Sequence, residues 1–328
     1  MRLVPDAPDR TPDKPGPGPV PPAVLRSLDL AVMKRIESLL PGEHLTPQVG
    51  SGTELAMIRP YFPGDDVRHI DWNATARLQE PHVRVHVGER ALTSWLVLDT
   101  SASMAFGTAD RRKWDVAEGV ALAVGHVATR RGNRLGVLSF GSNTSRIMRP
   151  RQGRLGLLAL LAELRREVEP EGAGATSLGA ALSGAAAVGR QRGLVVIVSD
   201  FRGERDWEAP LRQLRARHGV LAVEIVDPRE QELVPAGDLW LVDPETGRQV
   251  HVDTRKRRVR ARFAEAAAAE RNEVRAALRR AGADHVVLST AGDWLRIFAS
   301  HLRRGEAALR AGAPARAAVR NRIQAGRP

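Results

Sequence analysis

Two short apolar runs, each leading to an aspartate, constrain the fold of this chain more than any other feature. Residues 95–98 read Trp-Leu-Val-Leu and are followed by Asp99, and residues 194–198 read Leu-Val-Val-Ile-Val and lead through Ser199 to Asp200. Continuous apolar runs of this length are typical of strands buried on both faces, as in a parallel sheet. Open α/β sheets bind their ligands at the edge where such strands end. We therefore expect Asp99 and Asp200 to lie together at that edge.

Strand and helix patterns alternate along the chain after Asp99. We expect helices over 114–131, 153–168, 178–191, 207–217, 255–281 and 292–304, and further strands over 135–140, 220–226 and 285–288. Such βαβ order gives right-handed crossovers with helices on both faces of a sheet. The sequence therefore predicts an α/β protein with a doubly wound, mostly parallel sheet. A β-hairpin over 239–252, with the turn Asp243-Pro-Glu-Thr-Gly247, interrupts the alternation.

The chain divides into four segments by composition and pattern. The first, residues 1–23, is rich in proline and is expected to be a disordered or extended leader. Residues 24–92 combine an N-terminal amphipathic helix over 24–40 with a β-rich part that includes a strand over 82–87. The α/β domain follows over 93–304, with the hairpin as an insertion at 228–254. The last segment, 305–328, is an arginine-rich tail with Glu306 as its one acidic residue.

Polar side chains that suit a hard metal ion follow the two strands. Ser101 and Ser103 come at alternate positions after Asp99, and Thr176 opens a predicted helix between the two strands. Together with Asp200 these residues offer only hard oxygen ligands, which suit Mg²⁺ or Mn²⁺. The sequence thus predicts a metal site formed by Asp99, Ser101, Ser103, Thr176 and Asp200. In the structural alternative, the two serines cap the next helix and the two aspartates merely end their strands.

This set resembles the metal-ion-dependent adhesion site of von Willebrand factor A domains, in its Asp-x-Ser-x-Ser…Thr…Asp form. The resemblance implies a von Willebrand factor A-like fold that binds an Asp or Glu of a partner protein through the ion. The chemistry agrees with that mode of binding: when some of the two carboxylates and three neutral hydroxyls act through water, they offset the charge of a divalent ion incompletely at close range. One coordination position then stays open to an exogenous carboxylate.

The segment before the sheet carries a second resemblance. Its residues are Gly52-Thr53-Glu54, Arg59-Pro60-Tyr61-x-Pro63-Gly64-Asp65-Asp66-Val67-Arg68-x-Ile70-Asp71-Trp72 and Ala74-Thr75-Ala76-Arg77. This pattern is similar to the signature of domain-of-unknown-function family fifty-eight, whose members couple it to a von Willebrand factor A-like domain. The chain looks like the short soluble type of that family. The resemblance implies a MoxR-type AAA+ ATPase as partner, acting with it on a client protein.

Two interpretations of the acidic residues in this signature are open. Asp65, Asp66 and Asp71 with Arg68 form either a second functional site, such as a carboxylate pair for hydrolysis, or a structural turn. The structural interpretation predicts an internal Asp–Arg ion pair with Trp72 packed beneath it. We favour it, because no set of nucleophile, base and oxyanion donors is recognisable around these residues.

Several enzyme classes lack support in the sequence. A Gly-x-x-x-x-Gly-Lys-Ser/Thr phosphate loop is missing, which excludes a P-loop ATPase. Ser139 lies one residue away from a nucleophile-elbow pattern, and His82 and His86 have no third zinc ligand nearby. We therefore expect a non-enzymatic protein-interaction module. The alternative is a Mg²⁺-dependent phosphohydrolase, since a bound ion can polarise a phosphate oxygen.

The formal net charge of +12 raises nucleic-acid binding as a further alternative. Aromatic residues make up only 4% of the chain, which leaves little for stacking on bases. The absence of cysteine excludes disulfides and thiolate zinc sites. We expect a cytoplasmic protein, because no apolar stretch approaches the roughly 20 residues of a membrane span and the N-terminus has no signal-peptide core.

Overall fold

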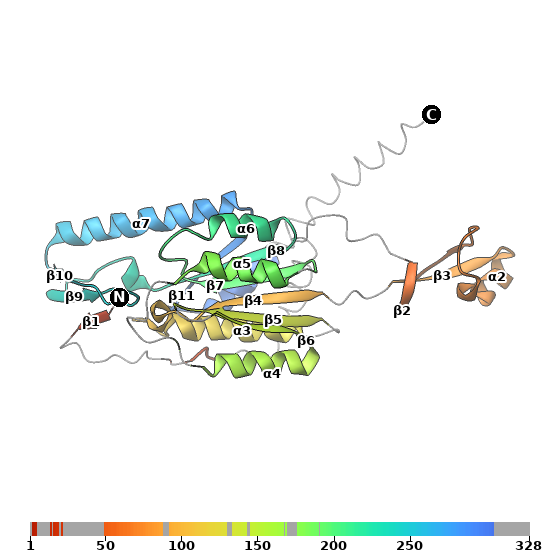
Figure 1. Ribbon diagram of the computed structural model, residues 1–328, viewed down its shortest axis with the longest axis horizontal. Coiled ribbons are helices and arrows are strands. Elements are labelled where there is room, and N and C mark those ends of the chain that lie inside the picture. Colours follow the sequence, from red (N-terminus) through yellow and green to blue (C-terminus); the bar gives the residue numbers. More distant parts are fainter. Residues whose placement is uncertain are drawn as a thin grey trace, which may run out of the picture. The chain divides into compact units, whose positions relative to one another are not determined.

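The structure is a computed structural model of the chain (Figure 1). It describes residues 2–4, 14, 16–19, 21, 49–87, 92–129, 133–142, 145–166, 168, 176–189 and 191–304. The chain divides into two compact units, a smaller one over Gly42–Ala91 and a larger one formed by Met1–Pro41 and Leu92–Pro328. The helix predicted over 24–40 and the arginine-rich tail over 305–328 lie outside the described residues.

The larger unit is built on a central sheet with the strand order β11-β8-β7-β4-β5-β6. Its strands are β4 (Thr93–Asp99), β5 (Arg134–Phe140), β6 (Ser145–Gln152), β7 (Gly193–Ser199), β8 (Gly219–Val226) and β11 (Asp284–Ser289). All neighbouring strands pair in parallel except β6, which runs antiparallel to β5. The predicted fold class, an α/β protein with a mostly parallel sheet, is confirmed.

Helices cover both faces of this sheet (Figure 1). One layer contains α3 (Lys113–Ala128), α4 (Gly153–Leu164) and a helix over 294–304, and the other contains α5 (Leu178–Val188), α6 (Glu208–Arg215) and α7 (Arg257–Arg280). Consecutive residues of β4 point into different layers: Leu96 and Leu98 pack with the first layer, and Trp95 and Val97 with the second. Burial on both faces explains why the run is continuously apolar.

The centre of the sheet is also the point where the winding reverses. The chain passes from β4 to β5 on one side and later returns to β7 on the other side, so both β5 and β7 are neighbours of β4. Ligand sites of doubly wound sheets lie at such a reversal, beyond the carboxyl ends of the strands. Asp99 ends β4 and Asp200 directly follows β7, so both carboxylates are placed there.

The predicted hairpin forms a separate antiparallel sheet from β9 (Asp238–Val242), β10 (Gln249–Asp253) and β1 (Arg2–Val4). Strand β1 lies within the leader, so residues 2–4 are extended, one of the two states expected for that segment. Strand β1 pairs with an edge of β9 whose backbone N–H and C=O groups would otherwise lack strand partners. This pairing cannot be predicted from the sequence of the leader itself. The backbone carbonyl of Pro17 likewise accepts a hydrogen bond from Trp294 Nε1 at 3.1 Å.

Strand β6, at the edge of the central sheet, was not predicted. It reads Ser-Arg-Ile-Met-Arg-Pro-Arg-Gln and is mostly exposed. Charged residues and proline are common on edge strands, where they discourage pairing with other chains, but they weaken the alternating pattern by which a strand is recognised.

The smaller unit contains β2 (Val49–Pro60), the 3-10 helix η1 (Val67–His69), α2 (Trp72–Leu78) and β3 (His82–Val87). Strands β2 and β3 pair antiparallel, and β3 coincides with the strand predicted over 82–87. Across both units, none of the helices in the described residues is long and apolar enough to cross a membrane.

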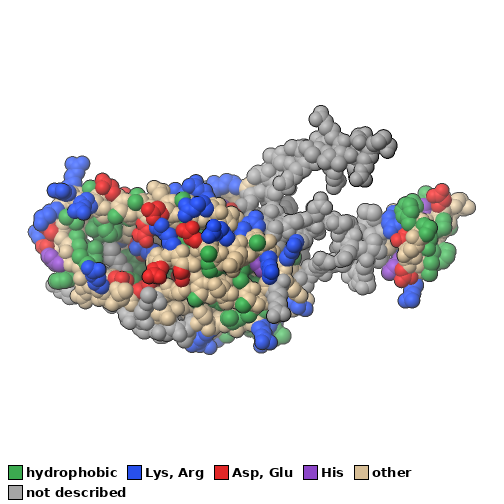
Figure 2. All heavy atoms as spheres, turned by 45° about the horizontal axis from the view of Figure 1, so that its top comes forward, with side chains coloured by type: hydrophobic (Ala, Val, Ile, Leu, Met, Phe, Trp, Pro, Cys, Tyr) green, Lys and Arg blue, Asp and Glu red, His purple; other side chains and the backbone are tan. Residues whose placement is uncertain are grey.

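Basic side chains of the larger unit are interspersed with acidic ones on the face shown in Figure 2. Among the described residues of this unit, Arg280 forms an ion pair with Glu208 and Arg205 forms one with Glu273. On this face the net positive charge is therefore not gathered into the continuous basic stripe that is typical of nucleic-acid binding.

Candidate metal site

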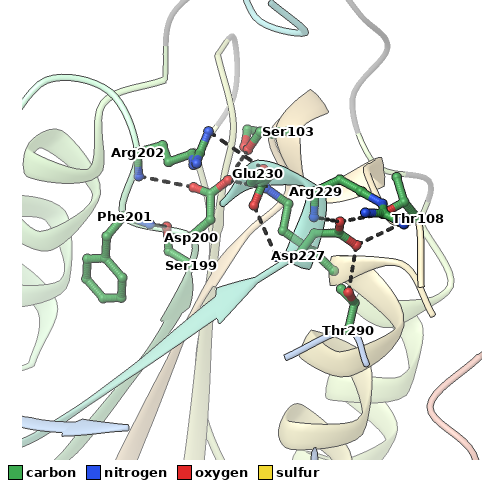
Figure 3. A network of polar contacts seen from close by, with 12 residues as sticks. Ser103, Thr108, Ser199, Asp200, Phe201, Arg202, Asp227, Arg229, Glu230 and Thr290 are labelled. Carbon is green, nitrogen blue, oxygen red and sulfur yellow. Dashed lines mark hydrogen bonds and ion pairs between the residues drawn. The ribbon is translucent and has the colours of Figure 1, made fainter. Parts of the chain in front are cut away.

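Four of the five predicted ligands converge at the ends of β4 and β7. Asp99, Ser101, Ser103 and Asp200 are all buried. Ser101 precedes the 3-10 helix η2 (Ala102–Ala105), and its hydroxyl lies 3.1 Å from that of Ser103. Ser103 in turn donates a hydrogen bond to Asp200 Oδ2 at 2.8 Å (Figure 3). A serine from the first loop thus bridges directly to the carboxylate of the second.

Asp99 is held by neutral donors. Its Oδ1 accepts a hydrogen bond from Ser101 N at 3.0 Å, and its Oδ2 accepts one from the hydroxyl of Ser199 at 2.6 Å. No cationic side chain of the described residues forms an ion pair with it. Burial, reinforced by the nearby charge of Asp200, raises the pKa of Asp99 to about 6. Within the described residues, the negative charge of Asp99 is therefore not balanced by a neighbouring cationic side chain.

Asp200 has a different environment, because a lysine accompanies it in the interior. Lys113 Nζ is fully buried and donates to Asp200 Oδ2 at 2.6 Å and to Glu230 Oε1 at 2.8 Å. Burial alone would raise the pKa of Asp200, but the charges of Lys113 and Arg202 outweigh it and hold the pKa well below its usual range. Asp200 is therefore ionised and already partly neutralised by the protein.

A strained residue shapes the loop after Asp200. Phe201 has φ of 54°, which is unusual for a bulky side chain, and it is buried against Trp207 with the ring centroids 5.6 Å apart. The turn lets Phe201 N donate to the hydroxyl of Ser199 at 3.0 Å and Arg202 N donate to Asp200 Oδ1 at 3.1 Å. Packing of the Phe201 ring thus holds a loop that orients Asp200.

A second buried carboxylate, Asp227, fixes the element that carries Glu230. It accepts hydrogen bonds from Thr108 N at 2.8 Å, Thr290 Oγ1 at 2.6 Å and Arg229 N at 2.9 Å (Figure 3). The last bond caps the 3-10 helix η3 (Pro228–Glu230). Because η3 is anchored in this way, Glu230 is placed to share Lys113 with Asp200.

Thr176, the fifth predicted ligand, lies just before α5. Its Oγ1 is buried and has no hydrogen-bond partner among the described residues. Its backbone N–H points to Glu245 Oε2 at 3.4 Å, in the turn between β9 and β10. Burial, together with the charges of Asp200 and Asp99, raises the pKa of Glu245 to about 7.

These features fit a hard divalent cation better than the structural alternative. Ser101 occupies the cap position of η2 but makes no side-chain capping hydrogen bond. Thr176 has a buried hydroxyl without a hydrogen-bond partner among the described residues, which is costly unless a ligand satisfies it. Within the described residues, no group of three or more His, Cys, Asp or Glu side chains is arranged to hold a metal. A site here must therefore use hydroxyl oxygens, which suits Mg²⁺ or Mn²⁺.

Sequence reasoning missed several residues around the site. Ser199 was recognisable in principle, because it directly precedes Asp200 on a buried strand. Lys113 and Glu230 carry no local signal, since a lysine at the start of a helix and a glutamate after a proline are ordinary surface residues. Glu245 was noted only as part of the hairpin turn. Its proximity to Thr176 comes from the tertiary structure.

The acidic signature of the smaller unit has structural roles. Asp65 forms a two-point ion pair with Arg59, with both N–O distances at 2.7 Å. Asp71 caps α2 and accepts a hydrogen bond from Arg84 Nε at 2.8 Å. Asp–Arg pairing is thus present, but its close pairs use Arg59 and Arg84, whereas Arg68 makes only an exposed contact with Asp66 at 3.8 Å. The expected packing of Trp72 is wrong: its side chain is 71% exposed, because capping by Asp71 makes Trp72 the first residue of α2.

The Asp65–Arg59 pair predicts a specific titration. The hydrogen bond from Arg59, followed by that from Phe62 N, lowers the pKa of Asp65 from 3.8 to about 2. Because this pKa is lowered by folding, the stabilisation from the pair is complete above pH 3.8 and is lost as the pH falls towards 2. We expect the Asp65 carboxyl signal in ¹³C NMR to titrate near pH 2, and near 4 in Arg59→Gln. Arg68→Gln is the control and should leave it unchanged; a wild-type midpoint near 4 would contradict the pairing.

Comparison with known proteins identifies relatives along most of the chain. A family model described as "Protein of unknown function DUF58" matches residues 57–273. Uncharacterized protein Rv1480 of Mycobacterium tuberculosis is 40% identical over 288 residues, covering 86% of this chain and 90% of the relative. Uncharacterized protein MAV169 of Mycobacterium avium is 44% identical over 126 residues, covering 37% of this chain and 73% of the relative.

Solved structures with a similar arrangement include a conserved hypothetical protein, BatB, from Bacteroides thetaiotaomicron. It is 11% identical with a TM-score of 0.41, covering 66% of this chain and 99% of that one. The VWA domain of SpRpn10 is 12% identical with a TM-score of 0.36, covering 63% of this chain and 92% of that one. The family match spans the acidic signature and most of the α/β unit. It agrees with the resemblance that the signature residues carry. This chain belongs to the DUF58 family.

Proposed function

We propose that this protein is a non-enzymatic interaction module that binds an acidic side chain of a partner through a metal ion. Asp99, Ser101, Ser103 and Thr176 would hold the ion, with Asp200 beside them. When bound, Mg²⁺ or Mn²⁺ supplies the positive charge that Asp99 lacks and a coordination position for an exogenous carboxylate. The chain's own residues orient these oxygens and keep the site buried.

One observation carries the proposal: Asp99, a buried carboxylate with no ion pair among the described residues, lies beside the hydroxyl of Ser101, which makes no capping hydrogen bond. Asp99 is only 4% exposed, and a buried carboxylate is costly unless a charge compensates it. The unpartnered Thr176 Oγ1 supports the same conclusion. Lys113 cannot serve Asp99, because its ammonium is taken by Asp200 and Glu230.

The surface next to the site favours an acidic partner. A groove there is lined by two arginines and one aspartate, Arg202, Arg248 and Asp243, together with the apolar residues Leu241, Val242, Pro244 and Val250. Two guanidinium groups beside a cation site attract carboxylates, and the apolar residues give the partner's backbone a surface to pack on. We infer that the bound segment is an Asp- or Glu-containing peptide.

For the partner itself we propose a MoxR-type AAA+ ATPase, with a client protein bound in turn. This part rests on the family resemblance, since no residue of the chain identifies the partner by itself. The phosphohydrolase and nucleic-acid alternatives make different predictions and are therefore outcomes of the test below.

The test is a tagged capture from the native host, in Mg²⁺ and in EDTA, with mass spectrometry of the bound proteins. We expect the wild type to retain an AAA+ ATPase in Mg²⁺ and to lose it in EDTA, and Asp99→Asn to lose it in both. Retention of the ATPase by all samples would place the interface elsewhere. Mg²⁺-dependent hydrolysis of p-nitrophenyl phosphate that requires Asp99 would favour the phosphohydrolase, and capture of nucleic acid alone would favour the third alternative.

A further inference from the structure

The turn between β9 and β10 holds one glutamate towards the candidate metal site. Asp243 organises this turn: it accepts hydrogen bonds from Glu245 N at 3.0 Å and from Thr246 Oγ1 at 2.6 Å. The turn closes through Gly247 N, which donates to the carbonyl of Asp243 at 2.8 Å. Gly247 has φ of 70°, a conformation that glycine adopts without strain. The turn is therefore internally satisfied and presents Glu245 in a fixed direction.

Glu245 faces the residue whose hydroxyl has no partner. Its Oε2 lies 3.4 Å from Thr176 N, while Thr176 Oγ1 is buried without a hydrogen bond in the described structure. No Lys, Arg or His of the described residues forms an ion pair with Glu245, and the nearest buried ammonium, that of Lys113, is bound to Asp200 and Glu230. Among the described residues, the one hydrogen bond that Glu245 accepts at the site is therefore long and weak.

Such an arrangement is unfavourable without a cation. Glu245 contacts Thr176 at the sheet edge where Asp99 and Asp200 are buried, so three acidic side chains are directed to one region, and the buried ammonium of Lys113 is shared by Asp200 and Glu230. A rigid turn that nevertheless brings a glutamate to this edge of the sheet suggests that the carboxylate has a ligand there. A divalent ion bound by Asp99 and the hydroxyls is the group that would reverse the repulsion.

We propose that Glu245 is an internal ligand that takes the coordination position open to a partner's carboxylate, so that the β9–β10 hairpin closes the site in the resting protein. This inference rests on the proposed metal site. A partner must then displace Glu245, and the hairpin acts as an autoinhibitory element. The groove lined by Arg202 and Arg248 lies along the same hairpin, which lets an acidic segment begin to bind before Glu245 leaves.

The test uses Mn²⁺ as the probe, because the relaxation of water protons reports how many waters contact this ion. The full-length wild type, Glu245→Gln and Glu245→Ala are compared with Glu265→Gln, an exposed glutamate on α7. We expect both Glu245 variants to bind Mn²⁺ about 10-fold more weakly or worse, by analogy with the loss of groups that support metal sites. The bound ion should also show faster water relaxation, because a water replaces the carboxylate.

Acetate extends the test to an external carboxylate. It should lower the water relaxation of Mn²⁺ bound to Glu245→Ala, by displacing the new water, and leave the wild type and Glu265→Gln unchanged. If Mn²⁺ binds through Asp99 but the Glu245 variants match the control in affinity and relaxation, the inference is wrong and the metal site stands. If neither the wild type nor any variant binds Mn²⁺, the proposed metal site itself is wrong.

Discussion

Replacement of Asp99 by asparagine is expected to abolish binding of Mg²⁺ and Mn²⁺ and to leave the metal-free protein at least as stable as the wild type. The amide has nearly the shape of the carboxylate, so no cavity opens at this buried position. Its oxygen can still accept the hydrogen bond from Ser101 N, and the Ser199 hydroxyl can rotate to accept one from the new NH₂ group. The variant thus removes a charge and little else.

The direction of the stability change follows from the environment of that charge. Burial and the charge of Asp200 raise the pKa of Asp99 from 3.8 to about 6. A carboxyl whose pKa is raised by folding destabilises the metal-free protein as the pH rises through this interval. At pH 7 the cost is on the order of 2–3 kcal/mol, which asparagine avoids.

Two measurements check this prediction. Calorimetric titration with MnCl₂ should show a loss of affinity of more than about 100-fold, since loss of a group that merely supports a ligand already costs 10–100-fold. Urea unfolding in EDTA gives the free energy of unfolding. Asp238→Asn, which removes an exposed carboxylate on β9, should match the wild type in Mn²⁺ affinity. Unchanged Mn²⁺ affinity in Asp99→Asn would show that the ion binds elsewhere.

Replacement of Lys113 by methionine is expected to lower the free energy of unfolding by about 3–5 kcal/mol, the usual effect of removing one partner from a buried ion pair. Lys113 is fully buried, and Asp200 and Glu230 both depend on its ammonium. Methionine fills a similar volume, so the loss is electrostatic: two buried carboxylates remain with only Arg202 nearby, at 3.8 Å from Glu230. Urea unfolding in metal-free buffer measures the change.

A second substitution shows whether the loss of stability in Lys113→Met comes from the unpaired carboxylates or from altered packing. Lys113→Met combined with Glu230→Gln removes one of the two stranded carboxylates and should recover part of the lost stability. Glu273→Gln, which removes a largely exposed glutamate paired with Arg205, should change the free energy of unfolding by less than about 1 kcal/mol. A loss of under about 1 kcal/mol in Lys113→Met would mean that the buried network contributes little to stability.

The fold and the positions of Asp99 and Asp200 at one sheet edge were predictable because their signals are local. A strand buried on both faces requires a continuous apolar run, and the residues 95–98 supply one without reference to distant parts of the chain. Helical and strand periodicities depend only on near neighbours, so their alternation defined the order of elements. The position of Asp99 and Asp200 after two such runs then placed both carboxylates at one edge of a parallel sheet.

The charge balance of the site was decided by tertiary structure. Lys113 is separated from Asp200 by 87 residues and from Glu230 by 117, and meets both only because α3 and η3 pack at the same sheet edge. Glu245 reaches Thr176 across 69 residues through the hairpin. Trp72, expected inside, is exposed, and β1 pairs with β9 from within the proline-rich leader.

The amino-acid sequence by itself determined the alternation of strands and helices, the mostly parallel sheet and the oxygen-rich loops at its edge, because each depends on residues close together in the chain. Only the tertiary structure decided which carboxylate is neutralised by Lys113, which is left without a cation and which side chain faces the site from the hairpin. The physical reason is that the energy of a buried charge depends on every group packed around it, and those groups come from distant parts of the sequence.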